Sequence, residues 1–275
     1  MTDEKFKIDQ EDGMDAMVVG SWSGHKHDML VDYVGASRGA RMRWPHASYI
    51  DLFCGPGRVV ERQTNAFRDG GALAAWKASC ANGGPSFSDV FIGDLDQRSV
   101  EFCRKRLETF GACVHAYVGA ASETVHRVIC DLPRGLNLAF LDPFSAEHLD
   151  FEIILALSRL NRIDILVHFS VMDIQRNIER EAVASGARLE RIAPGWREAI
   201  ELSHLPKSAF INAFLDYWKA LVERTANMTA ADMMPLIKNS KNGPLYRLIM
   251  LKRHPLAEKL WNDVGRDDKA QKDLF

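Results

Sequence analysis

Short apolar runs alternate with amphipathic segments over much of the chain. Near-continuous apolar runs are typical of parallel strands that are buried on both faces. Between them, apolar residues recur at three- and four-residue spacing, as Val100, Cys103 and Leu107 do, which predicts amphipathic helices. This alternation favours an α/β fold, a doubly wound, mostly parallel Rossmann-like sheet with helices on both faces. The predicted strands cover residues 49–53, 90–94, 112–118, 135–142 and 163–170, and the predicted helices cover 71–78, 97–110, 122–132 and 148–160.

The pattern changes at both ends of this alternation. Residues 1–24 are polar and acidic, which predicts a mobile or loosely docked arm, and we expect 25–275 to form a single domain. Residues 171–225 read as helices rich in aromatic side chains and have no counterpart in a minimal sheet, so they predict a helical insertion that acts as a lid or a docking surface. Two short apolar runs, 233–238 and 245–252, flank an Asn-Gly pair and predict an antiparallel hairpin that closes a sheet of about seven strands.

The first apolar run ends in two glycines, Gly55 and Gly57, that are one residue apart. Glycine has no Cβ, so a ligand can approach the backbone closely there. Asp51 lies near the carboxyl end of the same strand, where a doubly wound sheet holds its ligand. The segment therefore predicts a ligand-binding turn, and a turn with a purely structural role is the alternative.

The residues after the glycines separate three kinds of nucleotide-binding loop. A phosphate-binding loop needs Gly-Lys-Ser/Thr, but Arg58 follows Gly57. The dinucleotide fingerprint needs a third glycine where Val60 stands, and an acid about 20 residues further on, whereas the next strand ends much later, at Asp94. The segment Asp-Leu-Phe-Cys-Gly-Pro-Gly at 51–57 instead resembles motif I of S-adenosylmethionine (SAM) methyltransferases.

Two further strand ends carry acids. Asp94 ends the second strand, where a carboxylate can accept hydrogen bonds from both ribose hydroxyls of a nucleoside cofactor, while Asp96 is a candidate helix N-cap. Asp142, Pro143 and Phe144 follow the fourth strand, beside the first in the expected strand order. The resemblance to methyltransferases of amino nitrogens implies that the acid and the next carbonyl accept from the target amine, and that the aromatic ring stacks on a base. Those enzymes carry two prolines here and this chain carries one, so an ordinary Asp-Pro turn is the alternative.

Two other positions bear on a cofactor site. The third predicted strand ends in Gly119–Ser122, where methyltransferases often place an acid for the adenine amino group, and no acid is present here. Ser122 or a backbone carbonyl could substitute for it, and a weak or absent cofactor is the other explanation. Ser122 is also a candidate N-cap of the next helix. A helix is predicted over 24–34, and in methyltransferases such a helix often covers the cofactor. Lys26 or His25 could therefore line the pocket, but a solvated first turn is the favoured interpretation.

Composition narrows the functional classes. The net charge of −2 gives no global attraction to nucleic acid or to anionic lipid. No apolar run reaches transmembrane length, and the acidic N-terminus does not look like a signal peptide, so no membrane is expected. The five cysteines are scattered, which argues against a disulfide framework and against a zinc or iron–sulfur site. We therefore expect a reduced cytoplasmic protein without a metal. Structural roles are expected for His115, His126, His148, His168 and His204.

The order of these pieces resembles the three-Cys-motif partner (TcmP) family, bacterial proteins with a methyltransferase-like fold. The resemblance implies SAM as the cofactor and a partner protein that carries a three-cysteine motif like that of radical-SAM enzymes. It also implies cofactor contacts from Asp51, Phe53, Gly55, Gly57, Asp94 and Leu95. The matching segments are Lys26, Leu30 and Tyr33, Tyr-Ile-Asp-Leu-Phe-Cys-Gly-Pro-Gly at 49–57, Gly-Gly-Ala-Leu at 70–73, Phe-Ile-Gly-Asp at 91–94, Phe-Leu-Asp-Pro-Phe at 140–144, Pro-Leu-Tyr-Arg-Leu-Ile at 244–249, and Leu260-Trp261.

Two functional hypotheses from different classes follow. The first is a SAM-dependent methyltransferase that acts on a nucleobase or another amine. The second is a non-catalytic partner in which residues 171–225 dock another protein. Nucleic acid as the acceptor is a subsidiary hypothesis, and a solvated basic face is its alternative. It depends on positive charge near the terminal hairpin, at Lys238, Lys241, Arg247, Lys252, Arg253 and His254.

Overall fold

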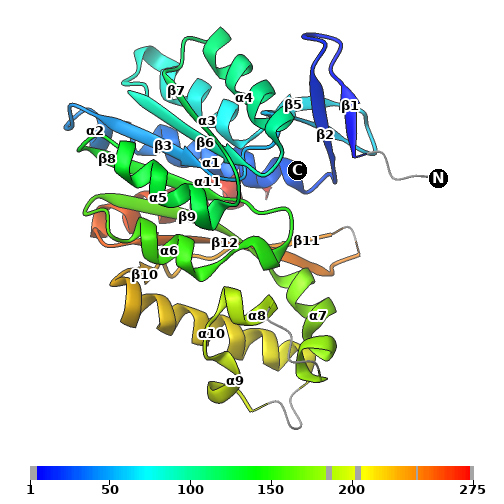
Figure 1. Cartoon of the computed structure of the whole chain (residues 1–275). Coiled ribbons are helices and arrows are strands. Elements are labelled where there is room, and N and C mark those ends of the chain that lie inside the picture. The colour runs from blue at the N-terminus through cyan, green and yellow to red at the C-terminus, as the bar shows by residue number, and fades with distance from the viewer. Residues whose placement is uncertain (1–4, 184–187, 202–205, 240, 273–275) are drawn as a thin grey trace.

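The computed structural model describes residues 5–183, 188–201, 206–239 and 241–272. Within these residues the chain forms an eight-stranded sheet with helices on both faces, and a separate four-stranded sheet (Figure 1). The predicted α/β fold class, a doubly wound and mostly parallel sheet, is confirmed. The second sheet was not predicted.

The parallel strands of the large sheet are short and consist mainly of apolar residues. All residues of the first of them, β3, are buried, as expected of a strand covered on both faces. The sheet order is β10-β12-β9-β8-β3-β6-β7, so β3 lies between β6 and β8. The carboxyl ends of these three strands are therefore neighbours. The bounds are β3 (Ala47–Asp51), β6 (Asp89–Asp94), β7 (Val114–Val118), β8 (Leu136–Leu141) and β9 (Ile163–Ser170).

Antiparallel strands close one side of the large sheet. β12 (Pro244–Lys252) pairs with β9 in antiparallel register, with Leu248 opposite His168. β11 (Leu236–Lys238) and β10 (Thr229–Ala230) both pair antiparallel with β12. The hairpin predicted around the Asn-Gly pair is confirmed as β11–β12.

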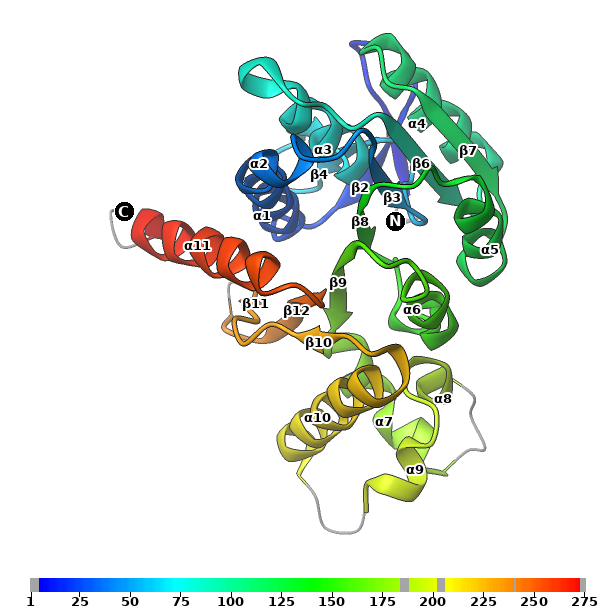
Figure 2. The same ribbon diagram turned by 90° about the vertical axis from the view of Figure 1, so that its left-hand side faces the viewer.

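Helices cover the two faces of the sheet in separate groups. Figure 2 shows α1, α2, α3 and α11 on one side of β8 and β9, with α5 and α6 on the other. None of the helices in the described part of the chain is both long and apolar enough to cross a membrane. The bounds are α1 (Ser23–Ala36), α2 (Arg38–Arg41), α3 (Gly71–Cys80), α4 (Gln97–Thr109), α5 (Ala121–Asp131), α6 (Phe151–Leu157) and α11 (Pro255–Lys272), with short 3₁₀ turns η1 (Ala81–Gly83) and η2 (Ala146–His148).

Local sequence explains where α4 begins and ends. The Asp96 carboxylate accepts a hydrogen bond from the Ser99 backbone N–H at 3.0 Å, so Asp96 is the N-cap. Gly111, which follows the helix, has a φ of +79°, a conformation that glycine adopts without strain. The corresponding prediction for α5 was wrong, because Ala120 occupies the N-cap position and Ser122 lies inside the helix.

The N-terminal residues form strands instead of the predicted polar arm. β1 (Phe6–Ile8) and β2 (Asp15–Val19) make an antiparallel hairpin. β2 also pairs in parallel with β4 (Arg58–Glu61), which pairs with β5 (Phe67–Asp69). The four strands lie beside α4 (Figure 1). Residues 6–19 are therefore part of the folded structure.

Arg106 of α4 explains why this acidic hairpin is docked. Its buried guanidinium donates hydrogen bonds to both carboxylate oxygens of Asp12, at 2.6 and 2.8 Å. It also donates to the backbone carbonyl oxygens of Asp15 and Pro56. One cation thus joins the hairpin, α4 and the glycine loop. Asp12, one of the acidic residues that suggested an arm, therefore pairs with Arg106, a residue distant in the sequence.

The predicted helical insertion packs its aromatic residues into the core on one face of the large sheet. Trp196, Phe210, Phe214 and Trp218 are all buried. The Trp218 ring lies 5.2 Å from that of Phe169 on β9, which attaches the insertion to the sheet. These aromatic side chains therefore do not form an exposed docking surface, although the sequence allowed that interpretation. The helices are α7 (Val171–Val183), α8 (Arg188–Ile192), α9 (Trp196–Ala199) and α10 (Lys207–Ala226).

We predict that Arg106→Ala lowers the free energy of unfolding by about 2–3 kcal/mol, less than the ~3–5 kcal/mol typical of a fully buried pair, because its partner Asp12 is partly exposed. Chemical denaturation measures the change. Arg104→Ala is the matched control on the same helix, since its 3.5 Å pair with Glu108 is exposed and contributes about 0.5 kcal/mol or less. Equal losses in the two variants would contradict a docking role for Arg106.

Candidate functional site

The ends of three neighbouring strands bring the predicted site residues together. Asp51 ends β3, Asp94 ends β6, and Asp142 directly follows β8. The Gly55 backbone N–H donates a hydrogen bond to Asp94 Oδ2 at 3.0 Å, so the glycine turn and the second acid are in direct contact. The parallel register of the strands produces this arrangement from residues far apart in the chain.

The two glycines of the turn are required by the backbone itself. Gly55 and Gly57 have φ values of +52° and +80°, which side-chain-bearing residues rarely adopt. A Cβ at Gly57 would lie 3.1 Å from Cys103 Cα on α4. The turn is thus built to pack tightly against α4.

Asp94 retains hydrogen-bonding capacity after its internal contacts are made. Oδ2 accepts from the Gly55 N–H, and Oδ1 accepts from the Asp96 N–H at 3.0 Å. An ionised carboxylate offers about four lone-pair sites, so about two remain. The side chain is partly exposed, and the next residue, Leu95, is 63% exposed. A hydroxyl-bearing ligand can therefore reach Asp94 beside an open apolar surface.

Asp142 is held by a lysine from α1. Lys26 Nζ lies 2.7 Å from Oδ1 and 2.6 Å from Oδ2, so it contacts both carboxylate oxygens. The Lys26 side chain is only 15% exposed, and the expectation of a solvated first turn was therefore wrong for this residue. His168 Nδ1 lies 3.5 Å from Oδ1, and His27 Nε2 lies 4.0 Å from Oδ2. Asp142 is the centre of a buried polar cluster.

Burial and charge give the two acids of this region opposite properties. Burial raises the pKa of Asp51 to about 8, and the negative charges of Asp142 and Asp94 add to the effect. Burial also acts to raise the pKa of Asp142, but the charge of Lys26, together with His168 and His27 in their protonated forms, outweighs it and holds that pKa below its usual value. At neutral pH Asp51 is therefore largely protonated, whereas Asp142 is a carboxylate.

The two histidines beside Asp142 are neutral at physiological pH. Burial lowers the pKa of His27 to about 4, and the positive charge of Lys26 adds to that shift. Burial likewise lowers the pKa of His168 to about 4, against the opposing charge of Asp142. Lys26 is thus the positive charge that balances Asp142.

The remaining predicted site residues differ in exposure. Phe144 is 79% exposed, and Lys5 Nζ lies 5.9 Å from the centre of its ring. Pro143 is buried and Phe53 is partly buried. The aromatic ring predicted to stack on an acceptor is therefore open to solvent. The roles assigned to these residues from the sequence remain predictions.

Sequence reasoning missed His168, His27 and Tyr246. The Tyr246 ring centre lies 4.4 Å from that of His168, and its hydroxyl donates to the Trp22 carbonyl oxygen at 2.9 Å. One signal was present, because alternate residues of a strand share a face and His168 lies near the carboxyl end of β9, next to the strand that precedes Asp142. No comparable signal identified His27 or Tyr246.

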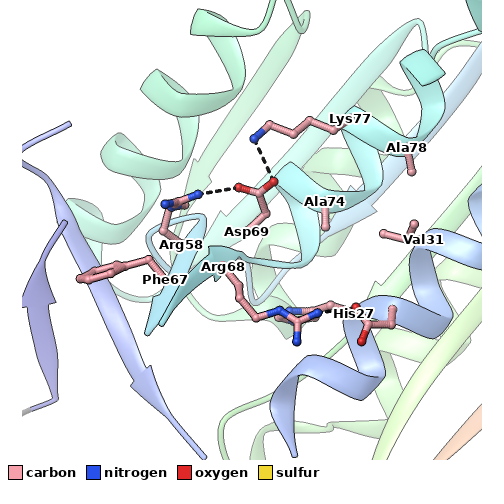
Figure 3. A pocket seen from close by; sticks show the side chains of 10 residues that line it. His27, Val31, Arg58, Phe67, Arg68, Asp69, Ala74, Lys77 and Ala78 are labelled. Carbon is pink, nitrogen blue, oxygen red and sulfur yellow. Dashed lines mark hydrogen bonds and ion pairs between the residues drawn. The ribbon is translucent and has the colours of Figure 1, made fainter. Parts of the chain in front are cut away.

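A pocket of about 450 Å³ opens beside His27, between α1, α3 and β5 (Figure 3). Asp69 lies between two cations there, 3.0 Å from Arg58 Nη1 and 2.8 Å from Lys77 Nζ. The pocket borders the Asp142 cluster through His27 and does not include Asp94. It is lined by His27, Asp28, Val31, Arg58, Phe67, Arg68, Asp69, Ala74, Lys77 and Ala78.

Solved structures share this architecture, although no family model and no curated protein matches the sequence. Protein LPL1258 from Legionella pneumophila aligns with a TM-score of 0.50 at 12% identity, over 85% of this chain and 89% of its own. An O-methyltransferase from Bacillus cereus in complex with S-adenosylhomocysteine (SAH) aligns with a TM-score of 0.49 at 12% identity, over 86% and 82%. The O-methyltransferase TomG from Streptomyces achromogenes, in complex with SAM, gives 0.48 at 14% identity, over 83% and 80%. At these identities the similarity concerns the fold alone.

We predict that Asp51→Asn becomes more stable relative to the wild type as the pH rises. In the unfolded chain an aspartate releases its proton at about pH 4, whereas burial holds the Asp51 pKa at about 8 in the folded state. Between these values the folded wild type binds one more proton than the unfolded chain, so its stability falls with increasing pH. The asparagine variant lacks this dependence and keeps an oxygen for the Phe53 N–H, which donates to Asp51 Oδ1 at 3.0 Å.

Chemical denaturation at about pH 5 and about pH 8 measures this difference. Asp96→Asn is the control, because the Ser99 hydrogen bond lowers the pKa of Asp96. The Asp96 carboxylate therefore stays ionised at both pH values, and its contribution to stability is lost only at lower pH. The cost of Asp96→Asn should therefore be the same at both pH values. A pH-independent difference for Asp51→Asn would show that its pKa is not raised.

Proposed function

We propose that the chain is a SAM-dependent methyltransferase whose cofactor lies across the ends of β3 and β6. The observation that carries the proposal is the hydrogen bond from the Gly55 N–H to Asp94 Oδ2 at 3.0 Å. It places a glycine turn beside a carboxylate on neighbouring strand ends, where doubly wound sheets bind nucleosides. The cofactor supplies an activated methyl group, and the protein holds it.

The residues around Asp94 fit a nucleoside. Its remaining lone pairs suit two ribose hydroxyls, because charge-assisted hydrogen bonds are stronger than neutral ones. The exposed Leu95 offers an apolar surface for a base. β7 ends without an acid, but Glu123, in the first turn of α5, has its carboxylate near Gly119: a Cβ built there would lie 3.9 Å from Oε2. Glu123 is thus our candidate partner for the adenine amino group.

The proposed acceptor is an amine, with a nucleobase as the specific possibility that Phe144 supports. Its exposed ring can stack on a base, and base–aromatic stacking contributes about 1–3 kcal/mol. Orientation of an amine against an activated methyl group supplies much of the rate enhancement, so no strong base is required. In this proposal Lys26 fixes the orientation of Asp142, and the acceptor meets the backbone after β8 together with Phe144.

The Lys26–Asp142 contact also supports a second candidate function. Because Lys26 binds both carboxylate oxygens, an acceptor amine meets an acid that is already neutralised. In a non-catalytic partner protein the same ion pair has only a structural role. The buried aromatic residues of the helical insertion do not add to this candidate, since they are packed into the core beside the large sheet.

The partner in either case is proposed to be a protein with a three-cysteine motif. Only the sequence resemblance supports this part. Purification of the tagged chain from its native host, followed by mass spectrometry, tests it, and the captured protein must carry that motif. Recovery of other proteins alone would count against the partner assignment.

Nucleic acid receives little support as an acceptor. Arg253 donates to four backbone carbonyl oxygens, those of Ser158, Leu160, Ala226 and Asn227. Lys252 pairs with Glu258 at 2.7 Å, and Arg247 donates to the Met234 carbonyl oxygen. These three cations are engaged within the chain. A retention on RNA or DNA that does not weaken with salt would remove the hypothesis.

We predict that SAH binds the wild type and that Asp94→Asn weakens binding at least about tenfold, because hydrogen bonds to a charged group contribute about 1.5–3 kcal/mol. Isothermal titration calorimetry measures both affinities. Asp96→Asn is the matched control, two residues away, and should leave the affinity unchanged. No binding by the wild type, or equal losses in the two variants, would overturn the cofactor site.

A second prediction separates the enzyme from the non-catalytic partner. If the chain transfers a methyl group to a base, Phe144→Ala should slow transfer from isotopically labelled SAM at least about fivefold, from the lost stacking, and leave SAH affinity unchanged. Candidate acceptors come from the native-host extract. Exposed Phe110 provides the control variant, Phe110→Ala, which should leave transfer intact. SAH binding without any labelled product would favour the non-catalytic partner.

A further inference from the structure

Three side chains with metal-binding atoms meet at the end of the sheet opposite the strand ends described above. Asp89 is the first residue of β6, Cys113 directly precedes β7, and His115 is the second residue of β7. The parallel register pairs Val90 with Val114 and Phe91 with His115. β7 is an edge strand, so the group faces solvent on one side.

The distances within this group suit a single ion. His115 Nε2 lies 3.0 Å from Asp89 Oδ1, and Cys113 Sγ lies 3.9 Å from each of these atoms. A tetrahedral ion with bonds of roughly 2.0–2.3 Å to N, O and S holds its donor atoms roughly 3.3–3.6 Å apart. Shifts of a few tenths of an ångström would therefore complete the coordination. Within the described residues, this is the one such group of three donors.

Neighbouring contacts already orient two of the three donors. The Ser88 hydroxyl donates to Asp89 Oδ2 at 2.8 Å, which leaves Oδ1 directed toward His115 and Cys113. The His115 ring stacks on Phe91 with centres 4.4 Å apart and planes 9° apart. Such outer contacts fix ligand orientation and typically change metal affinity by about 10–100-fold.

We propose that Asp89, Cys113 and His115 form a binding site for Zn²⁺. A thiolate, an imidazole and a carboxylate together suit a borderline-soft divalent ion, whereas Mg²⁺ and Ca²⁺ prefer oxygen ligands alone. Cys113 is exposed and the His115 side chain is 36% exposed, so a fourth position is open to water or to an external ligand. The site is independent of the proposed methyl transfer.

Sequence spacing gave no indication of this site. Asp89 is 24 residues from Cys113, and the pair Cys113 and His115 by itself supplies only two donor atoms. The sequence therefore led us to expect no metal and a structural role for His115. Only the pairing of β6 with β7 brings the donors together.

Co²⁺ titration of the tag-free full chain tests the proposal, because a cobalt–thiolate bond gives a charge-transfer absorption in the near ultraviolet. We expect one equivalent to bind with this band, and Zn²⁺ to displace it. Cys113→Ser should abolish the band and weaken Zn²⁺ binding at least about tenfold. Cys130→Ser, at another exposed cysteine, is the matched control and should change neither.

A second variant tests the imidazole without disturbing the packing. His115→Phe keeps a ring on Phe91 and should weaken Zn²⁺ binding at least about tenfold in calorimetry. Circular dichroism verifies that each variant is folded. Wild-type affinity in Cys113→Ser or in His115→Phe would overturn the site, as would the absence of a thiolate band in the wild type.

Discussion

The parallel pairing of β6, β3 and β8 is the constraint on which the rest of the site depends. It places the ends of three strands side by side, and the Gly55–Asp94 hydrogen bond then joins the turn after β3 to the end of β6. The left-handed conformations of Gly55 and Gly57 make this turn compact enough to pack on α4. A shift of one strand by one residue would turn its side chains to the opposite face and separate the acids.

The same arrangement places the acids Asp51 and Asp142 close together, and a lysine from α1 compensates the charge of one of them. Asp51 is buried and Asp142 is largely buried near it, and burial of two carboxylates is costly. Lys26 from α1 neutralises Asp142, while burial keeps Asp51 largely protonated at neutral pH. The helix that covers the sheet therefore also determines which acid carries a charge. Any ligand at the site would therefore meet a largely neutral Asp51 and an Asp142 carboxylate that is paired with Lys26.

Two additions to the sheet are held by different forces. The N-terminal hairpin depends on Arg106, whose guanidinium bridges Asp12 to the glycine loop. The helical insertion depends on aromatic packing, with Trp218 against Phe169. A polar contact thus holds one addition, and an apolar core holds the other. Because Arg106 of α4 also donates to the Pro56 carbonyl oxygen, it links the hairpin to the candidate cofactor turn.

The sequence by itself determined the fold class, the parallel strands of the large sheet with the helices between them, and the positions of Asp51, Asp94 and Asp142 at strand ends, because apolar periodicity and glycine placement are local signals. The tertiary structure alone decided that residues 6–19 join a second sheet and that Lys26 binds Asp142. It alone brought Asp89, Cys113 and His115 together. These contacts join residues that are distant in the chain, and a single sequence contains no local signal for which distant side chains will pair.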